Sequence, residues 1–223
     1  MTMFDAAETF APFSLEDVRA RALSRLSLDL PTSATDPLHK PHRGDHILNP
    51  DLYQEGLAEK AKPAAVLIPL VARGDETHIL LTRRSLALRR HAGQVAFPGG
   101  RIDPDDESAT AAALREAEEE IGLARQCVTP LGFLDAYLTH SGFRILPLVA
   151  EVHAPFTLTI NRTEVEEAFE VPLRFLMDPS NHLKESRTRE GITRHFHAMP
   201  YGEKNIWGVT AGILRNLHER LYA

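Results

Sequence analysis

Three glutamates lie close together in the segment "REAEEEIGL" of residues 115–123. If residues 107–121 form a helix, then Glu116, Glu119 and Glu120 fall within one arc of its surface. Each like-charged pair at these spacings costs about 0.2–0.5 kcal/mol in an isolated helix. A divalent cation would remove this repulsion, because Mg²⁺ prefers carboxylate oxygens and often binds substrate phosphates at the same time. The spacing therefore indicates a metal site that serves a phosphate-containing substrate.

Rigid elements must hold these glutamates, and the surrounding residues predict them. Residues 64–72 and 78–84 form apolar runs typical of two strands joined at the Gly74-Asp75 turn. Further strands are expected in residues 94–100, 127–138, 143–153 and 193–202, helices in 14–26 and 209–221, and a strand-to-helix turn near Pro172. Strands and helices mix without a regular βαβ period, which predicts an α+β, sandwich-like domain rather than a Rossmann sheet.

The helix of residues 107–121 has a second face that is less polar. Thr110, Leu114, Ala117 and Ile121 share this face, which we expect to pack on the sheet. Gly122 follows the helix and is expected to cap its C-terminus.

Residues 1–60 differ in composition from the rest of the chain. Ser14 and Asp17 predict the start of one helix, and the stretch that follows it is rich in Pro, Asp and His without any period. We therefore expect an N-terminal helix and an extended arm over residues 1–60, packed on a main domain over residues 61–223.

Composition and charge argue against several classes of protein. The 223 residues include 25 basic and 31 acidic side chains, and this net charge of −6 disfavours nucleic acid and anionic membrane as partners. Cys127 is the single cysteine, so no intramolecular disulfide can form, as expected in a reducing compartment. The first residues lack the basic and apolar stretches of a secretory signal, and the apolar run of residues 64–72 is too short to span a bilayer. We expect a cytoplasmic protein, whose oligomeric state the sequence leaves open.

The segment from Gly100 onward resembles the Nudix box, which is a glycine, an acidic residue and then Arg-Glu-aliphatic-x-Glu-Glu-x-Gly-aliphatic. The second part of this box is matched by Arg115, Glu116, Ala117, Glu119, Glu120, Gly122 and Leu123. The acidic residue is less certain, because counting back from Arg115 gives Glu107 and counting forward from Gly100 gives Asp106. We favour Glu107 as the partner of Arg115.

This resemblance implies an α/β/α sandwich with a mixed sheet and a pyrophosphatase that depends on Mg²⁺ or Mn²⁺. It implies metal binding by Gly100, Glu116, Glu119 and Glu120, structural roles for Glu107 and Gly122, and catalytic roles for Arg115, Glu116, Glu119 and Glu164. Arg115 is expected to orient other groups. The general base stays open among Glu116, Glu119 and Glu164, and the loop position of Glu164 could also be filled by Glu166 or Glu167. No motif for a covalent intermediate is found, so we expect direct attack by a metal-activated water.

The segment "LLTRRSLALRRHAGQVAFPGG" of residues 80–100 resembles the signature of the coenzyme A diphosphatase branch of this family. The matching residues are Arg84, Ser85, Arg89, Gly93, Phe97, Pro98, Gly99 and Gly100. The resemblance implies that Arg84, Arg89, Gly93, Phe97 and Gly99 bind the substrate. It also implies hydrolysis of coenzyme A or its thioesters to 3′,5′-ADP and 4′-phosphopantetheine or its acylated form. Arginine side chains suit this substrate, because their planar forks match phosphate oxygens.

Two other functions stay open at this point. One is a Nudix hydrolase that acts on ADP-ribose, dinucleoside polyphosphates or oxidised nucleotides. The other is a non-catalytic domain that senses a nucleotide, which the three intact helix carboxylates disfavour. Outside these motifs, His195 and His197 are expected to be an exposed or packed pair, and Trp207 is expected to be a core residue rather than a base-stacking one.

Overall fold

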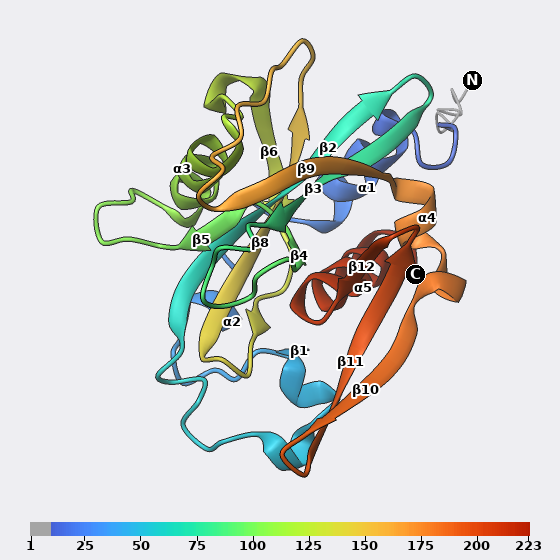
Figure 1. Ribbon diagram of the computed structural model, residues 1–223. Coiled ribbons are helices and arrows are strands. Elements are labelled where there is room, and N and C mark those ends of the chain that lie inside the picture. Colours follow the sequence, from blue (N-terminus) through green and yellow to red (C-terminus); the bar gives the residue numbers. More distant parts are fainter. Residues whose placement is uncertain (1–9) are drawn as a thin grey trace, which may run out of the picture.

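A computed structural model describes residues 10–223 of the chain (Figure 1). Residues 1–9, which include most of the stretch that argued against a secretory signal, lie outside the described residues. Within residues 10–223, the larger sheet has nine strands: β1 (Arg43–Gly44), β2 (Lys62–Arg73), β3 (Glu76–Arg84), β4 (Val95–Ala96), β5 (Gly99–Arg101), β6 (Val128–Phe133), β7 (Tyr137–Leu138), β8 (Phe143–Val152) and β9 (Val165–Pro172).

Five α-helices and four short 3-10 helices accompany the strands in the described part of the chain. They are α1 (Leu15–Arg25), α2 (Thr32–Thr35), α3 (Ala109–Ile121), α4 (Leu173–Met177) and α5 (Val209–Leu221), with η1 (Asp45–Ile47), η2 (Pro50–Leu52), η3 (Arg125–Cys127) and η4 (Pro179–Asn181). None of the helices formed by residues 10–223 is long and apolar enough to cross a bilayer.

The apolar strand β2 lies at the centre of the larger sheet. It pairs in parallel with β8 and antiparallel with β3, so the sheet is mixed. Its side chains alternate between two cores: Ile68 and Leu70 lie in a cluster with residues of α1, α4 and α5, whereas Leu67 and Val71 lie in a cluster with residues of α3. Helices therefore cover both faces of the sheet (Figure 1). The predicted α+β sandwich with a mixed sheet is confirmed.

The helix α3 ends at Ile121 as expected but begins at Ala109, two residues later than predicted. The Ser108 hydroxyl accepts a hydrogen bond from the Ala111 N–H at 3.1 Å, and Gly122 takes the left-handed conformation with φ of 68°. Its buried apolar residues are Ala109, Ala112, Ala113, Ala117 and Ile121. Thr110 and Leu114, which were expected to pack, are only half-buried. Because alanine side chains are short, this face lets the helix approach the strands that carry Gly99 and Gly100 closely.

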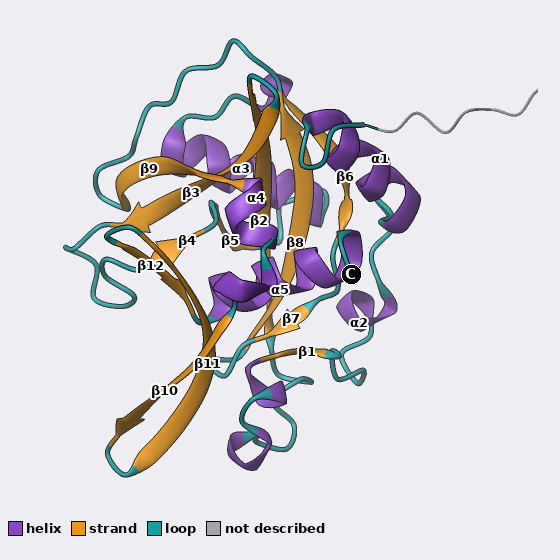
Figure 2. Ribbon diagram, turned by 90° about the vertical axis from the view of Figure 1, so that its right-hand side faces the viewer, coloured by secondary structure: helices purple, strands orange, loops and turns teal. Residues whose placement is uncertain are grey.

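A second sheet follows the larger one. Its strands are β10 (Leu183–Arg189), β11 (Ile192–Tyr201) and β12 (Lys204–Trp207), and all pairs are antiparallel. The strand predicted at residues 193–202 is confirmed as β11, whereas β10 and β12 were missed. Every residue of β10 is exposed, so no apolar alternation marks it in the sequence. The β10–β11 hairpin projects from the body of the molecule (Figure 2).

The arm that follows α1 is joined to the larger sheet by β1. This strand pairs in parallel with β7, where Gly44 lies opposite Leu138. Gly44 has φ of +152°, and a Cβ there would lie 2.3 Å from the Leu138 carbonyl oxygen. Only glycine therefore allows the arm to approach the sheet this closely.

A buried arginine of β8 also holds the arm. The Arg144 guanidinium donates hydrogen bonds of 2.9–3.1 Å to the carbonyl oxygens of Asp36, Pro37, His39 and Ala58. Arg144 is 5% exposed, and burial lowers its pKa. One side chain of the sheet thus satisfies the irregular backbone of the arm at four points.

Candidate active site

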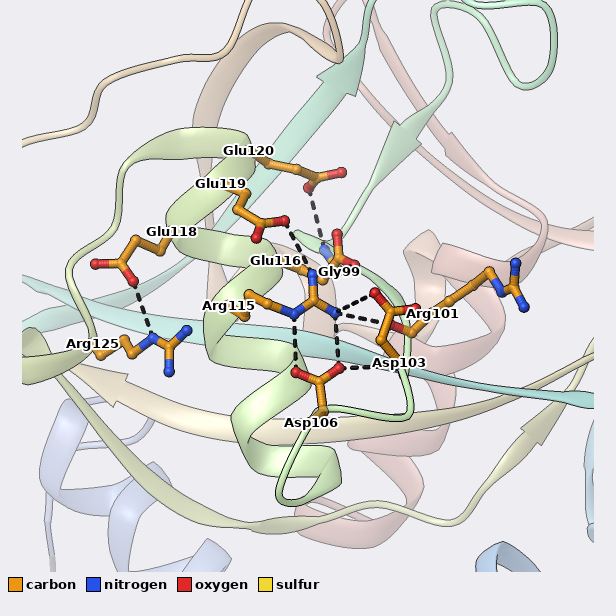
Figure 3. A network of polar contacts seen from close by, with 10 residues as sticks. All are labelled: Gly99, Arg101, Asp103, Asp106, Arg115, Glu116, Glu118, Glu119, Glu120 and Arg125. Carbon is orange, nitrogen blue, oxygen red and sulfur yellow. Dashed lines mark hydrogen bonds and ion pairs between the residues drawn. The ribbon is translucent and has the colours of Figure 1, made fainter.

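Two carboxylates of α3 face the Gly99-Gly100 segment (Figure 3). Glu120 is 3% exposed, and its Oε2 accepts a hydrogen bond from the Gly99 N–H at 3.2 Å. A Cβ on Gly100 would lie 2.5 Å from the Glu116 carboxylate, so any larger residue would displace that side chain. The two glycines therefore form a backbone surface against which the carboxylates of Glu116 and Glu120 are set.

Burial disfavours the charged form of these two carboxylates. Burial raises the pKa of Glu120 to about 7, and the nearby charges of Glu116 and Glu164 add to that rise, while the Gly99 N–H and Arg84 oppose it. Burial also raises the pKa of Glu116, against the effect of Arg115. Glu116, Glu120 and Glu164 therefore form an electronegative cluster that a cation would stabilise.

Arg115 is the centre of the surrounding ion-pair network (Figure 3). It donates two hydrogen bonds of 2.9 Å to the carboxylate of Asp106, one of 3.0 Å to Glu116 and one of 3.1 Å to Glu119. It also donates to the carbonyl oxygen of Arg101 at 3.1 Å. The Arg115 guanidinium lowers the pKa of Asp106 to about 2. Arg115 thus holds the Glu116 carboxylate, which also lies against the Gly100 backbone.

The acidic partner of Arg115 is Asp106, so the preference for Glu107 is wrong. Asp106 closes a turn in which its carboxylate also accepts a hydrogen bond from the Asp103 N–H at 2.8 Å. Glu107 precedes the capping residue Ser108 and is exposed. The loop before α3 is one residue longer than in the motif. The acidic residue therefore has the motif's spacing from Gly100 and not the motif's spacing from Arg115.

The carboxylates of this cluster form an open set. No three His, Cys, Asp or Glu side chains within residues 10–223 surround a common point closely enough to hold a metal ion by themselves. The side chain of Glu119 is 56% exposed and lies against Arg115. An open set fits Mg²⁺, because this ion keeps several waters and completes its shell with substrate phosphates.

Glu164 lies close to the same site. The Ser85 N–H, at the end of β3, donates a hydrogen bond of 2.8 Å to the Glu164 carbonyl oxygen. Its neighbour Glu167 is engaged elsewhere, because its carboxylate pairs with Arg83 and Lys204. Of the two, Glu164 is therefore the one that remains available to the cluster.

Arg84 lies beside Glu120 without closing a hydrogen bond to it. Its Nη1 is 3.7 Å from Oε1 of Glu120, and its buried Nε has no hydrogen-bond partner among residues 10–223. Arg84 also lines a cavity of about 520 Å³, together with Phe97 and Gly99. A half-buried guanidinium with an unused donor, next to an acidic cluster, is suited to bind an anionic ligand there.

The other two residues expected to bind substrate lie further away. Arg89 is exposed in the loop after β3 and is absent from the lining of this cavity. Gly93 has φ of +70° and lines a second, polar cleft of about 410 Å³, which shares Gln94, Val95 and Trp207 with the first cavity. The structure therefore brings Arg84, Phe97 and Gly99 together but leaves Arg89 and Gly93 at the margin.

The cavity extends from Arg84 and the Gly99-Gly100 segment to parts of the chain that no motif marks. Its far walls come from the arm (Asp45, His46, Asn49, Leu52, Tyr53, Leu57), from the end of β7 (Leu138, Thr139, His140, Ser141), from β11 (Arg194, His195, Phe196) and from the region of Trp207 to Ile213. Trp207 is half-buried, lines the cavity and has its ring 5.0 Å from that of Phe196. The expectation that Trp207 is a core residue is therefore wrong. His195 is exposed and His197 is half-buried.

Comparisons with known proteins show which family and which relatives this chain resembles. The family model described as "NUDIX domain" matches residues 61–189. The "Uncharacterized Nudix hydrolase NudL" of Yersinia pestis (strain Pestoides F) is 44% identical over 158 residues, which cover 71% of this chain and 79% of that protein. The protein of the same description from Yersinia pseudotuberculosis serotype O:1b (strain IP 31758) matches with the same values.

Two solved structures are similar at a lower level. A Nudix hydrolase from M. Smegmatis, RenU, has a TM-score of 0.44 at 24% identity, covering 53% of this chain and 74% of that one. The NUDIX domain of Shewanella oneidensis NrtR, complexed with ADP ribose, has a TM-score of 0.47 at 15% identity, covering 79% of this chain and 97% of that one.

Proposed function

The chain belongs to the Nudix hydrolase family, and from this premise we propose that it hydrolyses the diphosphate bond of coenzyme A or acyl-coenzyme A. The products are 3′,5′-ADP and 4′-phosphopantetheine or its acylated form. The observation that carries this proposal is the placement of Arg84. This arginine of the "LLTRRS" segment lies 3.7 Å from Glu120 and lines the cavity.

Nudix hydrolases generally use Mg²⁺ or Mn²⁺, and the donors present here fit such an ion. Glu116 and Glu120 would hold it, with Glu119, Glu164 and the backbone of Gly100 as further ligands. When bound, the ion neutralises charge on the diphosphate and activates a water for attack on phosphorus. The chain's own residues then decide where the substrate and its proton lie.

Arg115 and Arg84 have different parts in this reaction. Arg115 is a positioning residue, because its hydrogen bonds to Asp106 and Glu116 hold the Glu116 carboxylate against Gly100. Arg84 lines the cavity beside Glu120, and its guanidinium binds phosphate oxygens and so aligns the diphosphate with the carboxylates. The proton of the attacking water goes to a carboxylate of the cluster, for which Glu116, Glu119 and Glu164 are the candidates.

The first experiment is product analysis with Mg²⁺, using coenzyme A, 3′-dephospho-coenzyme A and ADP-ribose as parallel substrates. We expect coenzyme A to be turned over best and Glu120→Gln to lower its kcat at least about 100-fold, because that variant removes one charge from the cluster. Glu118→Gln is the matched control, since Glu118 lies on the same helix and its exposed side chain pairs with Arg125. Equal turnover of all three substrates would keep the hydrolase and overturn the coenzyme A assignment. Tight binding of one substrate without turnover would favour a nucleotide sensor.

A further inference from the structure

We propose that residues 45–57, which are part of the arm, and the facing strand β11 form a subsite for the acyl chain of a coenzyme A thioester. This inference rests on the proposed function, in which the diphosphate lies at Arg84 and the Gly99-Gly100 segment. It assigns a role in substrate selection to a part of the chain that precedes the family match at residues 61–189.

The cavity has the size and the lining that such a chain requires. Its volume of about 520 Å³ lies within the roughly 300–1,000 Å³ of typical ligand pockets. It starts at Gly99, Gly100 and Arg84 and then continues between apolar side chains. These are Leu52, Tyr53 and Leu57 of the arm, Val66, Phe143 and Ile145 of the sheet, and Phe196, Trp207, Val209 and Ile213.

The arm side chains of this lining keep part of their surface exposed. Leu52, Tyr53 and Leu57 are each half-buried and line the cavity. An apolar group placed there would remove their remaining surface from water, which is favourable at roughly 25 cal/mol per Å². A polar ligand would instead lose hydration against these side chains. The lining therefore favours an alkyl chain over the charged end of the substrate.

An amide group holds the two sides of the subsite together. The Asn49 Nδ2 donates hydrogen bonds of 2.9 Å to the carbonyl oxygens of His195 and Asp45, and its Oδ1 accepts one of 2.8 Å from the His195 N–H. Asn49 thus pairs with the backbone of β11 as a neighbouring strand would. This contact fixes the distance between the arm and the strand that carries Phe196.

The start of the arm is held on the opposite side by Asp45. Its carboxylate accepts hydrogen bonds from the Tyr137 hydroxyl at 2.9 Å and from the His140 N–H at 2.7 Å. His140 in turn lies 3.0 Å from the Arg194 guanidinium. The wall is therefore attached to β7 and to β11, and it is preorganised rather than assembled around a ligand.

A series of thioesters tests the subsite. We measure kcat and KM for coenzyme A and for its acetyl, butyryl, hexanoyl and octanoyl thioesters with the full-length protein. Each buried methylene contributes about 0.8 kcal/mol, which corresponds to a decrease in KM of up to roughly fourfold per methylene. We expect KM to fall with chain length until the cavity is filled, while kcat stays constant.

Two variants of the arm make the test specific. Leu52→Asn places an amide in the lining and is expected to abolish the dependence of KM on chain length while coenzyme A itself is turned over as before. Leu38→Asn is the matched control, because Leu38 belongs to the same arm, is 77% exposed and does not line the cavity.

The outcomes separate the two proposals. Turnover of coenzyme A with a KM that does not depend on chain length overturns the subsite and leaves the proposed function in place. A dependence that survives Leu52→Asn also overturns the subsite. If neither coenzyme A nor any thioester is hydrolysed, the proposed function fails, and the subsite fails with it.

Discussion

At the scale of single residues, the groups in contact with each carboxylate of the site determine its position and its charge. Glu116 is confined between Arg115 and the backbone of Gly100, and Glu120 is buried against the Gly99 N–H. The sequence predicted these glutamates from their spacing alone. The preference for Glu107 over Asp106 was wrong, because the choice depends on how a loop turns and not on helical periodicity.

The Asp106–Arg115 pair gives a direct test at this scale. Asp106→Asn removes the charge that holds Arg115, so we expect kcat to fall about 10- to 100-fold, as is common for groups that orient metal ligands. Glu107→Gln changes an exposed neighbour and is expected to leave kcat as it is. Steady-state kinetics of both variants under saturating Mg²⁺ is the measurement. Equal losses in the two variants, or a loss in Glu107→Gln alone, would contradict the assignment of Asp106.

At the scale of elements, apolar periodicity predicted the strands and helices that pack in the core and missed the strands that lack a buried apolar face. Strands β2, β3 and β8 and helices α3 and α5 carry buried apolar faces, and each was expected from the sequence. Strand β10 is exposed throughout and β12 has four residues, so neither carries such a pattern. The path of the arm was also beyond prediction, since Arg144 fixes it through backbone carbonyls, which every residue has.

Arg144 should therefore matter for stability more than a surface arginine. Arg144→Met removes the guanidinium donors from four carbonyl oxygens of the arm, of which those of Asp36 and Ala58 keep a backbone N–H, and we expect a loss of about 2–4 kcal/mol in the free energy of unfolding. Arg125→Met breaks an exposed ion pair with Glu118 and is expected to cost at most about 1 kcal/mol. Urea unfolding compares the two. Similar losses would show that the arm does not depend on Arg144.

At the scale of the whole molecule, the arm and the body meet at a histidine that is buried in its neutral form. Burial, together with the charge of Lys40, lowers the pKa of His46 from 6.5 to about 4. The unfolded chain binds a proton on this ring below pH 6.5, whereas the folded chain binds it only near pH 4. The stability that His46 provides is therefore complete above pH 6.5 and is lost as the pH falls toward 4.

This linkage predicts an acid-sensitive arm. Between pH 7.5 and pH 5, we expect His46 to lower the free energy of unfolding by up to about 2 kcal/mol. His46→Gln should reduce this pH dependence, and His42→Gln, which changes an exposed histidine of the same arm, should not. Urea unfolding at the two pH values is the measurement. An unchanged pH dependence in His46→Gln would assign the acid sensitivity to other groups.

Part of the cavity wall comes from residues 45–57 and 194–213, on either side of residues 61–189, while the remaining wall and the carboxylates come from within that range. In the proposed subsite, the wall of residues 45–57 that contacts the acyl chain therefore lies outside the segment that carries the carboxylates. Replacing residues 45–57 would exchange one wall without moving α3. A lineage of such enzymes can thus acquire new preferences by altering its leading segment, while the hydrolytic centre is inherited unchanged.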